Sequence, residues 1–143
     1  MTYDRDASLG YLTNWAARLL IRALERRLAG DSAGRMPVFL ALQRGRAMTQ
    51  AALVQHADVE QPTMANTLKR MERDGLVART PDPNDRRSAL VRLTEFGEQR
   101  AEAAFVAGVA VNEVAFAALT EAERPLFLDM LRRIIATVAR DGA

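Results

Sequence analysis

The chain has 143 residues, which is the length of one domain and enough to bury a hydrophobic core. Hydrophobic residues make up 49 % of it, a fraction that excludes wholesale disorder. The sequence has no cysteine, which excludes disulfides, thiol redox switching and cysteine-ligated zinc, and its net charge of +2 alone says little about partners.

The first predicted element is a long helix that begins at residue 8 and ends near residue 28. Apolar residues recur there at helical spacing, from Leu9 onwards. Asp6 or Ser8 is placed to cap this helix, and Gly30 is placed to end the segment.

No targeting or membrane segment is expected. The first residues lack the basic start and apolar core of a secretory signal peptide. The most apolar stretch, residues 103–119, is broken by Asn112 and Glu113 and is shorter than the roughly 20 residues that cross a bilayer. The sequence therefore predicts a cytoplasmic protein that does not contact a membrane.

Two short helices are predicted next, the first opened by Pro37 and running to about residue 43. The second covers residues 50–57, where Thr49 is a favourable N-cap. A tight turn at Asp58 follows, because aspartate tolerates the left-handed backbone conformation better than most residues.

A fourth helix is predicted up to residue 74, with Pro62 in its first turn and Gly75 as its stop. Three apolar residues at helical spacing predict the face that packs on the core: Met64, Leu68 and Met71.

After Gly75 the apolar period changes from that of a helix to that of a strand. Residues 76–79 and 90–93 alternate as half-exposed strands, and the turn-rich residues 80–87 lie between them. Two strands around one polar tip predict a β-hairpin of the kind called a wing.

Two further helices are predicted to follow the hairpin. Thr94 is placed to cap the fifth helix, and Thr120 with Glu123 forms a capping box for the sixth. Pro125 lies in the first turns of the sixth helix and removes one backbone hydrogen bond, so we expect an irregular start. The apolar side of the sixth helix, expected to be buried, carries Phe127, Met130, Leu131, Ile134, Ile135 and Val138. The predicted fold class is mainly α with a small β-hairpin wing, built on a winged helix-turn-helix.

In such a domain the second helix of the helix-turn-helix enters the major groove of duplex DNA and the wing reaches the backbone or the minor groove. Residues 43–94 carry nine basic and six acidic residues, whereas residues 95–143 carry five basic and eight acidic ones. The surface of the fourth predicted helix opposite its core face carries residue types that contact bases and phosphates: Gln61, Pro62, Thr63, Asn66, Lys69, Arg70 and Arg73.

Asn66 is the candidate for base reading, since a carboxamide pairs bidentately with adenine. Thr63, Lys69 and Arg73 are candidates for phosphate contacts. The alternative for this face is the solvated side of an ordinary amphipathic helix.

Arg86 and Arg87 follow Asp85 at the tip of the predicted wing. An arginine on a thin hairpin can enter a narrow minor groove, where the potential is most negative, and Asp85 can hold one guanidinium in place. We expect Arg87 to be the inserted residue; the alternative is an ordinary charged turn.

Residues 61–63, 68–77, 81–87 and 91–97 together resemble the MarR family of regulators. The Asp-x-Arg wing at Asp85, followed by Leu-Thr-x-x-Gly at Leu93, carries the resemblance. Asp58 stands where the family usually has glycine, which predicts an altered turn.

The resemblance implies one MarR-type domain over residues 1–143. Residues 8–30 and 95–143 would supply dimerisation helices, and residues 36–94 the DNA-binding region. It further implies a homodimeric repressor that binds double-stranded DNA at a pseudo-palindromic operator and is released by a small ligand. A dimeric interaction module or anti-regulator without specific DNA binding is the alternative.

In this family inducers bind in a cleft between the dimerisation helices and the winged region. The residues expected near that cleft are Tyr11, Trp15, Arg18, Met36 and Phe39. Trp15 could stack on an aromatic acid that Arg18 pairs with; the alternative is that these residues are ordinary core or interface. No nucleophile–base set, metal-ligand cluster or cofactor loop is present, so we expect neither an enzyme nor a cofactor.

Overall fold

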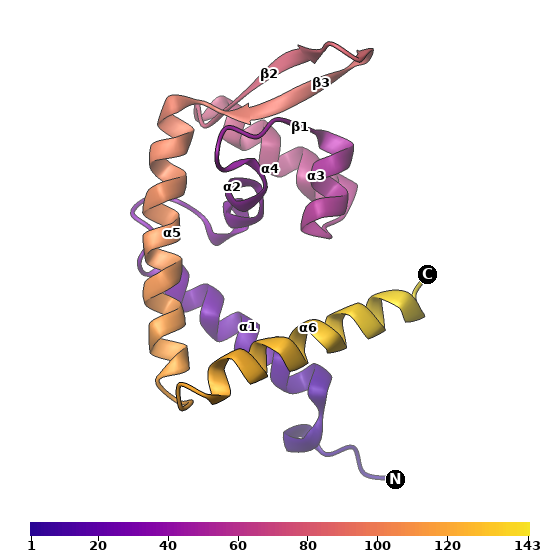
Figure 1. The fold of residues 1–143 in the computed structure, drawn as a ribbon, viewed down its shortest axis with the longest axis vertical. Helices are drawn as coiled ribbons and strands as arrows, with labels where there is room; N and C mark the ends of the chain where they lie inside the picture. Colours follow the sequence, from indigo (N-terminus) through magenta and orange to yellow (C-terminus); the bar gives the residue numbers. More distant parts are fainter. The chain divides into compact units, whose positions relative to one another are not determined.

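The computed structural model describes all 143 residues, as helices joined by turns and a small antiparallel sheet (Figure 1). The predicted mainly α class with a hairpin wing is confirmed. The α-helices are α1 (Leu9–Glu25), α2 (Met36–Leu42), α3 (Gln50–Ala57), α4 (Gln61–Arg73), α5 (Glu95–Phe116) and α6 (Glu123–Asp141), and short 3-10 helices cover Arg5–Ala7 and Ala33–Arg35. The chain forms two compact units, residues 1–108 and 109–143, and the boundary falls within α5.

Side-chain caps begin α1 and α3 where the sequence predicts them, and the bonds of the predicted capping box form just before α6, which begins at Glu123. The Thr49 hydroxyl accepts a bond of 3.1 Å from the amide of Ala52, and the Ser8 hydroxyl caps α1 in the same way. At α6 the amide of Thr120 donates to the Glu123 carboxylate at 2.8 Å, while the Glu123 amide donates to the Thr120 hydroxyl, which is the predicted capping box. Hydrogen bonding of the Glu123 carboxylate to Thr120, first to its amide and then to its side chain, holds the pKa of Glu123 below its usual value.

The turn between α3 and α4 is retained, as predicted for aspartate at its centre. Asp58 adopts the left-handed conformation, with φ of 50°, and its amide donates to the carbonyl of Val54. The helix-turn-helix geometry therefore survives without glycine at this position.

The sheet contains a strand that the sequence analysis missed. Strand β1 (Met48–Thr49) pairs with β3 (Asp85–Leu93), which pairs in turn with β2 (Val77–Asp82). A two-residue strand shows no periodicity, so the sequence carries no signal for it. The hairpin strands also extend into the tip expected at 80–87. Pro81 is tolerated in β2 because this strand lies at the edge of the sheet.

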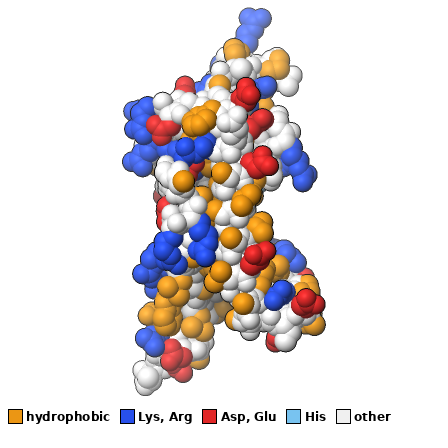
Figure 2. Space-filling view, turned by 90° about the vertical axis from the view of Figure 1, so that its left-hand side faces the viewer, with side chains coloured by type: hydrophobic (Ala, Val, Ile, Leu, Met, Phe, Trp, Pro, Cys, Tyr) orange, Lys and Arg blue, Asp and Glu red, His pale blue; other side chains and the backbone are white.

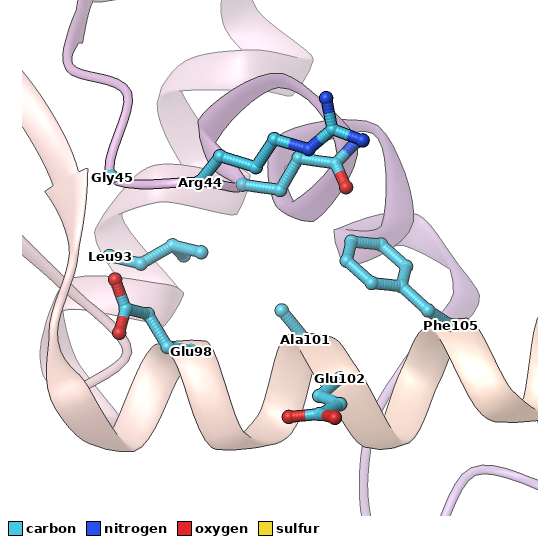
Figure 3. Close-up of a pocket in the computed structure, with 8 residues that line it drawn as sticks. Arg44, Gly45, Leu93, Glu98, Ala101, Glu102 and Phe105 are labelled. Atoms are coloured by element: carbon cyan, nitrogen blue, oxygen red, sulfur yellow. The ribbon is translucent and has the colours of Figure 1, made fainter.

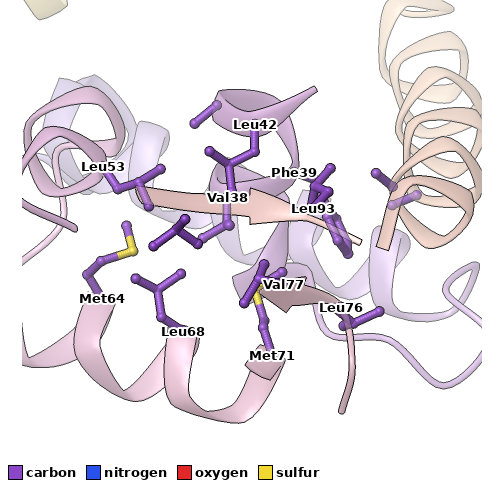
Figure 4. Close-up of a cluster of buried hydrophobic side chains, with 14 residues drawn as sticks. Val38, Phe39, Leu42, Leu53, Met64, Leu68, Met71, Leu76, Val77 and Leu93 are labelled. Carbon is purple, nitrogen blue, oxygen red and sulfur yellow. The ribbon is translucent and has the colours of Figure 1, made fainter. Parts of the chain in front are cut away.

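The core lies between α2, α3, α4 and the sheet (Figure 4). The predicted inward face of α4 is confirmed, since Met64, Leu68 and Met71 are all buried. Phe39 and Leu42 of α2 fill the centre and are fully buried. This packing fixes one side of α4, so its opposite side faces solvent.

Neither α1 nor α6 buries a residue within the single chain. The expected burial of the apolar side of α6 is therefore wrong for one chain: Ile135 is 59 % exposed and Val138 63 %. Helical period alone indicates an apolar face but does not say whether the same chain covers it. None of the helices combines the length and the apolar character needed to span a bilayer.

Candidate nucleic-acid interface

Helix α4 presents a polar face that points away from the core. All seven residues predicted for this face are exposed: Gln61, Pro62, Thr63, Asn66, Lys69, Arg70 and Arg73. They lie together because the buried residues of α4 recur at i, i+4 and i+7 and the polar residues occupy the remaining positions. The helix can therefore offer amide, hydroxyl and cationic groups to a groove.

Arg73 is tied to its neighbour at the end of α4. Its Nε lies 3.0 Å from Oδ1 of Asp74, and this hydrogen bond raises the pKa of Arg73 above its usual value. A contact of Arg73 with a phosphate would have to share its guanidinium with Asp74. Lys69 and Arg70 form no ion pair within the chain.

Arg79 of β2 is a residue that the sequence analysis did not single out. Its guanidinium reaches the Glu72 carboxylate of α4 at 2.9 Å and the Gln50 side chain of α3 at 3.4 Å. It thus links the two helices of the helix-turn-helix to the wing. Strand alternation indicates that Arg79 is exposed, but not that it bridges two helices.

The wing tip is held by two aspartates. The Asp82 carboxylate accepts from the amide of Asn84, and the Asp85 carboxylate from the amide of Arg87, both at 2.9 Å. Asp82, which the sequence analysis did not name, shapes the turn as much as Asp85 does.

The arginines of the tip project into solvent. The Arg87 side chain is 96 % exposed, and its Nε stands 3.9 Å from Oδ1 of Asp85, so Asp85 fixes the backbone of the tip more than the guanidinium. Figure 2 shows basic side chains at the uppermost end, where the hairpin of Figure 1 projects. Asp82 and Asp85 balance the charge of Arg86 and Arg87 at the tip, but the two arginine side chains are exposed and can contact a polyanion.

The five residues predicted for an effector site have different surroundings in the structure. Tyr11 and Trp15 of α1 pack edge to face at 6.2 Å, and the Arg5 guanidinium lies over both rings. Arg18 bonds Asn14 on the same helix. Phe39 lies in the core and Met36 is half-buried at the start of α2.

A cavity of about 400 Å³ lies between the loop after α2 and the first half of α5 (Figure 3). Leu93, Ala101 and Phe105 face its interior, and Arg44 lies across from them. Gln43, Gly45, Glu98 and Glu102 complete the lining. Arg44 and Gly45 both have positive φ, at 63° and 71°, so the loop shape that bounds the cavity was not predictable from periodicity.

The segment that contains the helix-turn-helix and the wing is similar to known proteins. A model of the MarR family matches residues 38–89, from α2 into the wing. The transcriptional regulator HosA of Escherichia coli O111:H- is 38 % identical over 86 residues, which are 60 % of this chain and 64 % of HosA. The match thus spans less than two thirds of that relative.

Two solved structures share the fold over most of the chain. The PcaV transcriptional regulator of Streptomyces coelicolor, in complex with its natural ligand, has a TM-score of 0.87 at 23 % identity and covers 96 % of this chain and 99 % of PcaV. A mutant MarR of E. coli complexed with operator DNA has a TM-score of 0.81 at 25 % identity, covering 88 % of this chain and 92 % of that one.

Proposed function

This chain belongs to the MarR family, and from that membership we propose that it regulates transcription by binding operator DNA in a sequence-specific manner as a homodimer. The observation that carries the proposal is the exposed polar face of α4 together with the exposed arginines of the wing. The name of HosA and the operator complex of MarR support it. Relatives that are transcription regulators agree with the expectation that the chain is not an enzyme.

In the proposed complex α4 enters the major groove and the wing reaches toward the flanking minor groove. Asn66 reads a base edge, while Thr63, Lys69 and Arg70 contact the backbone. Arg87 enters the minor groove, held by the turn that Asp82 and Asp85 shape.

The homodimer is supported by apolar surface that one chain leaves uncovered. Leu19 and Ile21 of α1 are each 50 % exposed, and α6 exposes Ile135 and Val138. Figure 2 shows hydrophobic side chains open to solvent on the face over α5. Within α5 itself, Val106 is 67 % exposed. Exposed apolar surface on this scale marks an interaction site. A two-fold dimer would read a pseudo-palindromic operator, with half-sites about 34–36 Å apart.

The proposed action is repression, relieved by a small ligand. Two places on the chain are suited to an aromatic acid: the exposed cluster of Tyr11, Trp15 and Arg18, and the cavity beside Arg44 and Phe105. Both combine a cation with aromatic or apolar surface. The ligand in the PcaV structure supports a ligand-binding role for this fold.

The experiment that tests the function is fluorescence anisotropy with labelled duplex from upstream of the protein's own gene. A scrambled duplex competes at near-physiological salt. We expect nanomolar binding that resists the competitor. Weak binding that is equal on both duplexes and abolished by salt would contradict the proposal and favour a dimeric interaction module.

Replacing Arg87 with alanine is expected to weaken binding to every duplex by about tenfold, since the residue contributes charge rather than base contacts. Two copies per dimer should lower the slope of log affinity against log salt by about two. Titrations at several salt concentrations measure this slope. Arg87→Lys retains the charge and should keep the slope; a slope unchanged in Arg87→Ala would contradict the contact.

Replacing Asn66 with alanine is expected to flatten discrimination at one or two base positions, by about 1–3 kcal/mol at each. Binding to single-base operator variants measures this loss. If affinity for operator and scrambled duplex fell by the same factor, Asn66 would not read a base.

A further inference from the structure

A nearly buried carboxylate lies in the loop between α1 and α2. The Asp31 side chain is only 4 % exposed, and each of its oxygens accepts from a different arginine. Oδ1 lies 2.9 Å from Nη1 of Arg35, and Oδ2 lies 2.7 Å from Nε of Arg100. Arg100 belongs to α5, so Asp31 ties the loop to that helix.

Arg35 extends the chain of ion pairs to α4. Its second terminal nitrogen, Nη2, donates to Oδ2 of Asp74, the residue that follows the last turn of α4. The Arg35 side chain is 15 % exposed and that of Asp31 4 %, so the pair with Asp31 is shielded from water, whereas the Asp74 carboxylate, at 34 %, is partly exposed. Hydrogen bonds from Arg73 and from Arg35 hold the pKa of Asp74 below its usual value.

A series of three ion pairs therefore connects α5 to the end of α4: Arg100 with Asp31, Asp31 with Arg35, and Arg35 with Asp74. The packing of α4 involves Met64, Leu68 and Met71 and leaves Asp74 beyond the core. A planar guanidinium can bond two carboxylates in fixed directions, which an ammonium group cannot do. The core resumes at Leu76 and Val77, so the ion pairs add a directional restraint to a helix end that apolar packing also holds.

We propose that Asp31 and Arg35 are positioning residues for DNA recognition: they fix the end of α4 relative to α5, and so set the separation of the two recognition helices in the dimer. The inference rests on the proposed function, because the position of α4 relative to α5 affects DNA binding only if two copies of the chain bind one operator. Neither residue needs to touch DNA, and their substitution should change which operator geometry is accepted.

The test uses Arg35→Lys in the 143-residue chain. Lysine keeps the positive charge but lacks the planar guanidinium that bonds two carboxylates in fixed directions. The probes are the upstream duplex and two versions with one base pair added or removed between its half-sites. We expect the wild type to prefer its own spacing by at least tenfold. Arg35→Lys should bind the native duplex about tenfold more weakly and retain only a few-fold preference, with an unchanged dimer and unfolding midpoint.

Asp74→Asn supplies a second variant that does not disturb a buried charge, since its side chain is 34 % exposed. It should shift spacing preference in the same direction. Arg79→Lys is the matched control: Arg79 also bridges two partners, Glu72 and Gln50, but does not reach α5. It should leave spacing preference intact.

A second measurement does not need DNA. Because the chain has no cysteine, a single introduced cysteine can be labelled specifically. A spin label on Gln61→Cys would report the distance between the two α4 helices, which should be narrowly distributed in the parent and broadened by Arg35→Lys. A narrow distribution and an intact spacing preference in Arg35→Lys would overturn the inference while leaving the regulator function standing. Failure of the wild type to bind any duplex would overturn both.

Discussion

Replacing Gly97 with alanine is expected to unfold the winged region at ordinary temperature. A Cβ at this position would lie 1.9 Å from the carbonyl oxygen of Leu76 and 2.9 Å from its carbonyl carbon. That backbone cannot move away freely, because the Leu76 oxygen accepts from the amide of Thr94 at 3.0 Å and the Thr94 hydroxyl donates to Gly75.

The expected cost exceeds the about 1–3 kcal/mol of ordinary overpacking, and is large beside the about 5–15 kcal/mol that holds a domain folded. Urea unfolding followed by circular dichroism measures it. Gly108→Ala is the matched control in the same helix, since its Cβ would meet only Met36 Cε at 3.7 Å. The control should gain about 0.5–1 kcal/mol from helix propensity. Equal midpoints for the two variants would contradict the close approach at Gly97.

Ile135→Glu is expected to convert the dimer to monomers and to lower operator affinity by more than a hundredfold. Ile135 is 59 % exposed in the single chain, so a charge there costs little in a monomer. Across an apolar interface the same carboxylate would be buried without a partner. Since two linked recognition helices bind far more tightly than one, loss of the dimer removes most of the affinity.

Sedimentation equilibrium at micromolar concentration measures the oligomeric state, and anisotropy measures the affinity. Ala136→Glu adds the same charge on the polar side of α6, near Asp129 and Arg133, and should remain dimeric. A dimeric Ile135→Glu would show that this face of α6 lies outside the interface.

Much of the fold was predictable because its signals are local. The caps at Ser8, Thr49 and Thr120 are read within four residues of chain, and all three are present in the structure. The inward face of α4 follows from period alone. By contrast, β1 exists only through pairing with residues about forty positions away, at Val91 and Leu90. No local pattern indicates it.

The candidate interface divides in the same way. Exposure of Asn66 and Lys69 follows from the helical period, but the pairing of Arg73 with Asp74 depends on side-chain direction. Phe39 was placed near an effector cleft because the family resemblance puts that cleft beside the first two helices, and the structure shows its side chain fully buried in the core. The ion pair of Asp31 with Arg100 joins residues 69 positions apart, a separation that sequence patterns do not report.

The edge strand β2 also bears on how copies of the chain meet. Pro81 offers no amide to a neighbouring strand, and the pairing of β2 with β3 becomes irregular between Pro81 and Asp82. The opposite edge, β1, is only two residues long. An exposed sheet with two such interrupted edges resists strand-by-strand aggregation. The wing can therefore remain exposed to solvent without pairing with the strands of another copy, and copies of the chain associate through helical surfaces instead.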